Sequence, residues 1–218
     1  GNPQGNTILG IDAGNALTSG NQNTLIGNDA GLNLSTGQRN VSVGYQAGKA
    51  QTDSQAINIG VNAGLSSATL SQAVSIGYES NYTGLNERSV AVGYQTGFNG
   101  WSRDSVLIGD RAGRGGGGLK GVHVGGQAGF NYLYGADGGI SIGYQAGFSN
   151  TSGVENTNLG YKAGYNITTS TANTNIGYEA GKNVTSGFAN TFVGKGAASN
   201  DTIIGDSNVG VGQNALYQ

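Results

Sequence analysis

The sequence contains neither cysteine nor methionine in its 218 residues. Without cysteine the chain has no disulfide bonds, thiolate metal sites or thiol nucleophiles, and without methionine it lacks the other common target of oxidation. Proline occurs once and charged residues make up 10% of the chain, whereas glycine occurs 43 times. Glycine does not follow the Gly-X-Y period of collagen, and regularly spaced aliphatic residues argue against disorder. The remaining interpretation is a folded chain built from a repeated structural unit.

The charge pattern also excludes several partners. The net charge is −2 and the ten basic residues are scattered singly, so there is no basic stripe of the kind that nucleic acids or anionic membranes select. No apolar run approaches the ~20 residues of a membrane span. The chain begins with Gly1-Asn2-Pro3-Gln4, which resembles neither a start methionine nor a signal segment. We therefore expect a processed product or a piece of a longer chain.

A glycine that follows a short aliphatic stretch recurs every 16 to 18 residues. These anchor glycines are Gly10, Gly27, Gly44, Gly60, Gly77, Gly93, Gly109, Gly125, Gly143, Gly160, Gly177, Gly194 and Gly212. Periodic arrays of short units are typical of solenoids. The sequence thus predicts one tandem-repeat domain over residues 1–218, an all-β parallel solenoid of about thirteen coils of ~17 residues. At about 4.8 Å per coil it would be roughly 60 Å long.

The strand of each coil, about five residues long, has two regular columns. The residue before the anchor is always aliphatic, and the residue two places earlier is Thr, Val or Ile. Because alternate side chains share a face of a strand, we expect both columns to face the interior and the variable residue between them to face outward. The predicted structural core is Val43, Ile59, Ile76, Val92, Ile108, Val124, Ile142 and Ile176. On this interpretation Ile142→Asp unfolds local coils, whereas Ser141→Asp is tolerated.

After the anchor comes a nearly fixed segment such as Gly44-Tyr45-Gln46-Ala47-Gly48. It predicts a tight corner with positive φ, in which the alanine points into a narrow interior. Asparagine recurs before the strands, as at Asn23 and Asn173. Stacked amides at that position are expected to hydrogen-bond from coil to coil.

Some repeats resemble a known family. Ser89-Val90-Ala91-Val92-Gly93 and Gly139-Ile140-Ser141-Ile142-Gly143 are similar to the strands of YadA-like head repeats in trimeric autotransporter adhesins. The segment from Asn173 to Gly181 resembles the N-T-x-x-G-x-x-A-G variant of phage tail-fibre-like and haemagglutinin-like proteins. The resemblance covers nearly the whole chain and implies a left-handed β-roll, three chains side by side, and attachment at a bacterial or virion surface. The period is longer than in the typical adhesin head, and trimerisation rests on the resemblance alone.

No catalytic, cofactor or metal site is predicted. The twelve carboxylates are dispersed, so an acid–base pair is disfavoured. Asp12 and Asp29 share a repeat position, which raises a cation site as an alternative, but the Ca²⁺-binding repeat pattern is missing and solvated corner residues are favoured. His123 occupies the column expected to face outward. The segment 114–120 does not match a phosphate loop and is interpreted as a flexible bulge.

The aromatic residues form two columns, one directly after the anchor glycine and one after the second glycine of the corner. We favour stacking that covers the thin core or packs between chains. The alternative is a glycan-binding surface. Its first candidates are Trp101, Tyr132 and Tyr134, which lie in irregular units; the longer segment 132–138 is expected to protrude as a loop.

The favoured function is an extracellular structural or adhesive fibre segment, an adhesin head or tail fibre on a cell or virion surface, without catalysis. Its partners would be copies of itself, as a homotrimer or end to end, and a glycan or other surface receptor. The alternative is a self-assembling filament or matrix protein. Ice binding needs an outward threonine array, and it is disfavoured because the threonines share the column predicted to face inward. A depolymerising enzyme ranks lowest. The strands nearest both ends have no cap of their own, so we also expect stacking or continuation there.

Overall fold

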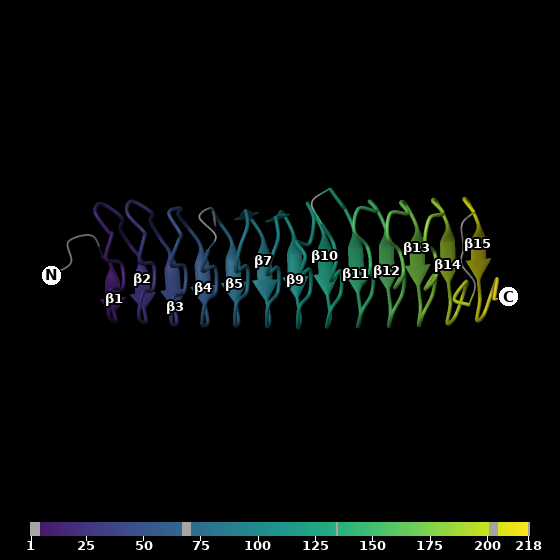
Figure 1. Ribbon diagram of the computed structural model, residues 1–218, viewed down its shortest axis with the longest axis horizontal. Coiled ribbons are helices and arrows are strands. Elements are labelled where there is room, and N and C mark those ends of the chain that lie inside the picture. Colours follow the sequence, from purple (N-terminus) through teal and green to yellow (C-terminus); the bar gives the residue numbers. More distant parts are fainter. Residues whose placement is uncertain (1–4, 67–70, 134, 201–204, 218) are drawn as a thin grey trace.

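The computed structural model describes residues 5–66, 71–133, 135–200 and 205–217. In this part the chain is an elongated β-solenoid with no helix, and one parallel sheet runs along its whole length (Figure 1). The thirteen strands of this sheet are β1 (Thr7–Leu9), β2 (Thr24–Ile26), β3 (Val41–Val43), β4 (Ile57–Ile59), β5 (Val74–Ile76), β7 (Val90–Val92), β9 (Val106–Ile108), β10 (Val122–Val124), β11 (Ile140–Ile142), β12 (Thr157–Leu159), β13 (Thr174–Ile176), β14 (Thr191–Val193) and β15 (Val209–Val211). Each strand pairs with the equivalent strand of the next coil, which confirms the predicted parallel β-solenoid of ~17-residue coils. The strands are three residues long, shorter than the five expected.

The anchor glycines hold the coils in register. Their φ angles lie between 125° and 139°, a conformation that residues with a Cβ rarely adopt. A Cβ on Gly44 would also lie 2.5 Å from the carbonyl oxygen of Gly60 in the next coil. The N–H of Gly60 donates to the carbonyl of Val43 at 2.8 Å. The repeat therefore needs glycine at this position both for the backbone angle and for the close approach of neighbouring coils, and the corner expected from the sequence is confirmed.

Most strands bury the side chains that were predicted to point outward and leave partly exposed those that were predicted to point inward. In the typical strand the middle residue is buried and its two neighbours are only partly covered, as in β3 and β7. The residues predicted as core, Val43, Ile59, Ile76, Val92, Ile108, Val124, Ile142 and Ile176, thus lie on the outer side, where Ile59 is 38% and Ile108 40% exposed. The prediction of an aliphatic core from these columns is wrong.

The physical reason is the narrowness of the coil. The alanine of most corners is buried, as predicted, and the glycine beside it lies directly against the middle residue of the strand, as at Gly48. A Cβ on Gly48 would lie 2.7 Å from the hydroxyl oxygen of Ser42 and 2.9 Å from Nδ2 of Asn58. Only one side chain per strand reaches this space, and its size and polarity vary from coil to coil.

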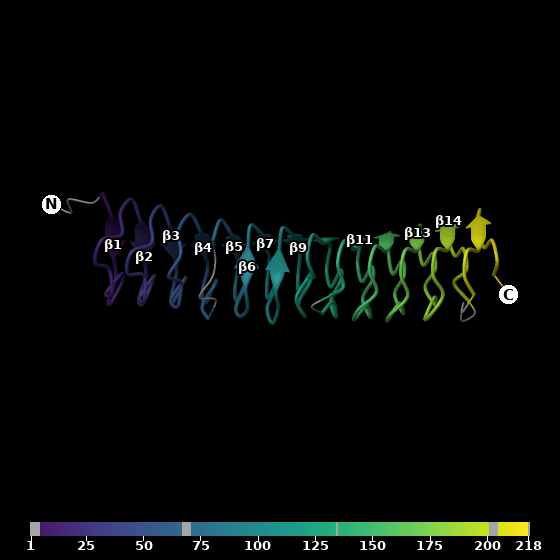
Figure 2. The ribbon, with the colours of Figure 1, turned by 90° about the horizontal axis from the view of Figure 1, so that it is seen from above.

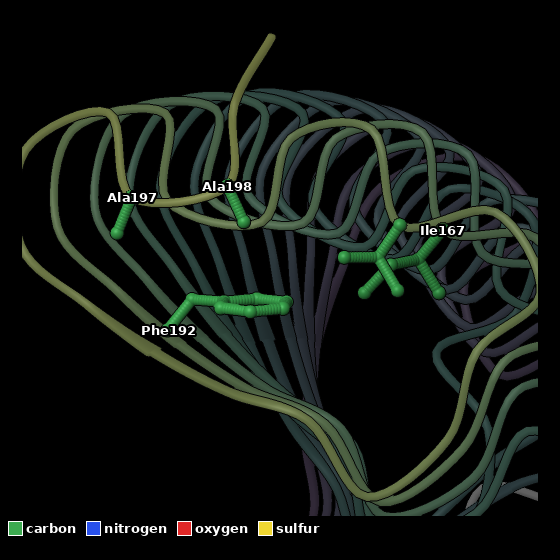
Figure 3. Close-up of a cluster of buried hydrophobic side chains, with 5 residues drawn as sticks. Ile167, Phe192, Ala197 and Ala198 are labelled. Carbon is green, nitrogen blue, oxygen red and sulfur yellow. The ribbon is translucent and has the colours of Figure 1, made fainter. Parts of the chain in front are cut away.

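The interior is consequently mixed in character. Apolar clusters fill it near both ends: Leu25 and Leu34 pack with alanines in one, and Phe192 lies in the same interior as Ile167 and Ala198 in the other (Figure 3). Between them the inward residues are largely polar. Gln51, for example, donates to the side-chain oxygen of Asn40 at 2.7 Å and accepts from Asn58 at 2.7 Å.

Asparagines before the strands form the expected ladder. The backbone N–H and side-chain Nδ2 of Asn190 both donate to Oδ1 of Asn173, each at 3.0 Å. The N–H of Asn40 likewise donates to Oδ1 of Asn23 at 2.9 Å. These amides are buried, so each bond satisfies groups that would otherwise be costly to keep from water. The ladder ties successive coils together independently of the sheet.

Candidate interaction surfaces

The outer side of the thirteen-stranded sheet is a continuous apolar surface. It presents the first and third residues of every strand, and all twenty-six of these positions are Thr, Val, Ile or Leu. Two columns about 7 Å apart and roughly 60 Å long outline a strip on the order of 400 Å². We call this strip the apolar face. The largest apolar patches on typical monomers are of that size and are often functional.

A third column extends this surface along one edge. It is formed by the residue that follows each anchor glycine, and its exposed apolar members are Ile11, Tyr45, Val61, Tyr78, Tyr94, Tyr144, Tyr161 and Tyr178. Asp110 and Lys195 occur in this column, whereas the two strand columns carry no charge. Depletion of charge at the centre of a surface with aromatic residues beside it is typical of protein interfaces.

Aromatic side chains stack along the rod, as expected. Tyr161 lies 5.7 Å from Tyr144 and 5.0 Å from Tyr178 between ring centroids, in near-parallel orientation. In the second column the guanidinium of Arg114 lies 5.1 Å from the ring of Phe98 and 5.7 Å from that of Phe130. Rings inside such stacks cover one another's faces. The ladders therefore expose ring edges and hydroxyl groups, and offer few free faces to the ring of a sugar.

Trp101 lies in a different setting. It immediately precedes β8 (Ser102–Arg103), which pairs in parallel with β6 (Asn86–Glu87) to form a second small sheet; Figure 2 shows β6 apart from the row of main strands. The indole is 47% exposed. Leu85, Trp101, Arg103 and Leu119 line a recess of about 40 Å³.

Arg103, which lines the recess, belongs to a small group of ion pairs. Arg103 Nε lies 3.0 Å from Glu87 Oε2, and Arg88 binds Asp104 through Nε at 2.6 Å and Nη2 at 3.1 Å. The hydrogen bonds that Arg88 donates to Asp104 lower the pKa of the Asp104 carboxyl below its usual value and raise the pKa of Arg88. Each pair connects two neighbouring coils. The side chains that line the recess are thus mainly apolar, and the charged one among them, Arg103, is paired with Glu87.

Of the two other residues predicted for binding, the structure describes only Tyr132, and it is not on this surface. Tyr132 is fully buried and its ring centroid lies 4.4 Å from that of His123, so the prediction that Tyr132 contacts a ligand is wrong. In the described part of its segment Ala136 is buried as well, whereas Leu133 is 49% exposed. Tyr134 lies outside the described residues. The structure does not bring Trp101 and Tyr132 together in one site.

His123 was expected at the surface and is instead completely buried. It occupies the middle position of β10, so the same reversal of the sheet accounts for the error. Its Nε2 lies 3.1 Å from the carbonyl oxygen of Gly117. Burial lowers the pKa of His123 to about 4. Gly116, Gly117 and Gly118 are also buried, so this glycine run lines the interior and is not a bulge.

The acidic corner residues are held by protein groups. Asp29 accepts hydrogen bonds from Lys49 at 3.0 Å, Gln46 at 3.1 Å and Asn28 at 2.7 Å. The bond from Lys49, with that from Gln46, lowers the pKa of the Asp29 carboxyl. Over the described ranges no three His, Asp or Glu side chains gather in a group that could hold a metal ion.

Within residues 5–66, 71–133, 135–200 and 205–217 there is no helix long and apolar enough to cross a membrane. Comparison with protein-family models, with curated proteins and with solved structures finds no match to this chain.

Proposed function

We propose that this chain is a structural and adhesive fibre segment that acts outside the cell, on a cell or virion surface, and that its apolar face packs against copies of the same chain. The observation that carries the proposal is the apolar face itself, twenty-six uncharged positions along the full length of the sheet. A homotrimer is the arrangement that the resemblance to YadA-like repeats implies. The irregular coils near Trp101 are the segment we assign to attachment.

The size of the apolar face supports association. Covering a strip of about 400 Å² contributes on the order of 10 kcal/mol per chain at about 25 cal/mol per Å². Association costs an estimated 4 to 15 kcal/mol in lost freedom of motion, so a face of this length approaches or exceeds that cost. One coil contributes less than ~1 kcal/mol on the same basis. A long array is therefore needed for a stable interface, which agrees with the many coils of this chain.

Two alternatives share part of this support. A self-assembling filament would use the same face and would differ only in whether the contact closes on itself or propagates. Ice binding was disfavoured because the threonines were expected inside; that reason is wrong, because Thr24 and Thr174 lie in the first strand column. Threonine nevertheless fills only five of the thirteen positions in this column and none in the other, so the hydroxyl array is interrupted. A non-catalytic role is favoured, since Asp29, Asp104 and Glu179 pair with lysine or arginine.

Sedimentation equilibrium at micromolar concentration tests the proposal. We expect the unmodified chain to sediment as a trimer, and the double variant Val92→Lys/Ile108→Lys as a folded monomer with an unchanged circular dichroism spectrum. The matched control Gln72→Lys/Asn99→Lys adds the same charge at exposed positions outside the apolar face and should stay trimeric. A monomeric unmodified chain, or unchanged association of the Val92/Ile108 variant, would refute the role of this face.

A further inference from the structure

We propose that the stacked tyrosines beside the apolar face are a site of oxidative cross-linking, at which a haem peroxidase with hydrogen peroxide joins neighbouring rings as dityrosine and so ties one coil to the next. The pairs concerned are Tyr78 with Tyr94, Tyr144 with Tyr161, and Tyr161 with Tyr178. Association of chains is not required, because both rings of each pair belong to one chain.

The rings of each pair are stacked on one another. Their centroids lie 5.4 Å apart for Tyr78 and Tyr94, 5.7 Å for Tyr144 and Tyr161, and 5.0 Å for Tyr161 and Tyr178, and the ring planes are within 17° of parallel. The stacking follows from the fold, since each ring comes directly after an anchor glycine and the strands before these glycines pair in register. Two groups held in contact react as if each were highly concentrated around the other. Radicals formed on neighbouring rings therefore couple with each other before they meet a second chain.

The same rings are open to an oxidant. Their exposed fractions range from 39% for Tyr161 to 49% for Tyr178, so the outer edge of each ring is accessible and free to turn toward its neighbour. The chain has no cysteine or methionine, which are the common targets of oxidation. In the other aromatic column each of the stacked pairs Tyr82–Phe98 and Phe148–Tyr165 includes a phenylalanine, which has no phenol to oxidise. The pairs after the anchor glycines are thus the sites where coupling is favoured.

The reaction balances with the peroxide as oxidant. Each of two phenols gives one electron to the peroxidase and one proton to water or a base, and the two radicals form a carbon–carbon bond between ring carbons next to the hydroxyl positions. The hydrogens on those carbons then move to the oxygens and restore the phenols, so the product lacks two hydrogens and one hydrogen peroxide becomes two waters. At Tyr78 a base is already in place, because Glu79 accepts a hydrogen bond from the phenol and raises its pKa.

The bond would have a structural consequence. It joins residues 16 or 17 positions apart in the sequence and closes a loop, which restricts the unfolded chain as a disulfide of similar span does. Each coil of a solenoid contacts only its neighbours, so a bond between neighbouring coils opposes local opening of the array. A chain without cysteine thereby acquires a covalent link between coils.

Peroxidase treatment of the full chain at micromolar concentration tests the site. The band of single-chain mass from a denaturing gel is digested with trypsin and analysed by mass spectrometry, which restricts the measurement to bonds within one chain. Because trypsin cuts after Lys and Arg, the Tyr78 pair should join peptide 50–88 to 89–103, and the Tyr178 pair should join 121–162 to 163–182. Each product should weigh two hydrogens less than the sum of its peptides, and fragmentation locates the linked residues.

Tyr45 is the internal comparison. It lies in the same column and is 51% exposed, but the equivalent residues of the adjacent coils are Asn28 and Val61. The stacked pairs should therefore exceed any link of Tyr45 within the chain at least about tenfold. Absence of dityrosine from the single-chain band, or equal linkage of Tyr45, would overturn the proposal. So would a link from Tyr94 to Tyr144, which lie three coils or about 14 Å apart.

Phenylalanine variants provide the second test, because they keep the ring in the stack and remove only the phenol. Tyr161→Phe should abolish both links of its stack and leave the link between Tyr78 and Tyr94 at its full yield. Tyr45→Phe is the matched control and should leave all the pairs unchanged. Oxidation of the chain unfolded in urea should spread the links over other tyrosines, such as Tyr165. The same pairs in urea, or unchanged dityrosine at Tyr144 and Tyr178 in Tyr161→Phe, would refute the role of the stacks.

Discussion

The reversed sheet makes a sharp prediction about two adjacent residues of β11. Ser141 is fully buried, and a Cβ on the neighbouring Gly147 would lie 3.0 Å from Nδ2 of Asn158, so the interior here has no spare room. Ser141→Asp adds two heavy atoms, which costs about 1 to 3 kcal/mol by overpacking. It also buries an unpaired carboxylate, which adds about 3 kcal/mol or more. The total is roughly 4 to 6 kcal/mol.

Ile142→Asp, one residue along, should behave differently. Ile142 lies on the apolar face and is only partly covered, so its replacement leaves the interior filled and the new carboxylate in contact with water. We expect about 1 kcal/mol from lost aliphatic contacts within the chain. The larger effect should be on association, because a charge at the centre of an interface is costly.

Thermal melting followed by circular dichroism distinguishes the two variants. At 2 to 4 °C per kcal/mol for a chain of this size, Ser141→Asp should lower Tm by roughly 10 to 20 °C, or melt the coils around β11 as a separate transition. The Tm of Ile142→Asp should be compared with that of the double variant Val92→Lys/Ile108→Lys, in which association is also expected to be lost. This comparison separates the effect of lost association on Tm from the effect of a damaged fold. A large loss for Ile142→Asp with Ser141→Asp tolerated would show that the aliphatic columns face inward after all.

Two further predictions concern the core. Burial lowers the pKa of His123 from 6.5 to about 4. The neutral side chain therefore contributes on the order of 3 kcal/mol of stability, which is fully present above pH 6.5 and is lost as the pH falls to about 4. Urea unfolding at a series of pH values should show this loss, and the variant His123→Leu should not show it. Gly44→Ala should cost about 2 to 4 kcal/mol, since φ there is 136° and a Cβ would meet the backbone of Gly60. Gly126→Ala, whose Cβ would meet only the Tyr144 ring, should be tolerated; equal melting of the two glycine variants would refute the argument.

Much of the fold follows from the sequence because local rules determine it. The anchor glycines mark the period, the alanine at Ala47 and its equivalents marks the narrow side of the corner, and the asparagine before the strand marks the ladder; the structure confirms all three. The direction of the sheet does not follow. The alternation of residue types separates the two faces of a strand, but it does not say which face is buried, and a shift of one residue exchanges them. The prediction assigned the more regular face to the interior.

The candidate site was predictable only in part. Trp101 is conspicuous as a single tryptophan in an irregular coil, yet its companions Leu85 and Leu119 meet it only through the pairing of β6 with β8 and of Arg103 with Leu119. Those pairings require the number of residues in three successive coils to match, which the sequence does not make obvious. Tyr132 was misassigned because aromatic residues in a long segment resemble an exposed loop, whereas here the ring fills space that Gly139 and Gly118 leave in the interior.

The reversal itself bears on function. The inward column changes freely from Leu25 to Asn58 to Phe192, whereas the outward columns stay aliphatic or threonine in every coil. Strand propensity explains part of this, because Val, Ile and Thr are favoured in strands. It does not explain why twenty-one of the twenty-six positions are aliphatic, because threonine and tyrosine also have high strand propensity and would make the exposed surface more polar. Two columns that stay aliphatic or threonine through thirteen coils without being fully buried by their own chain support our proposal that another copy, with the same columns at the same spacing, covers them.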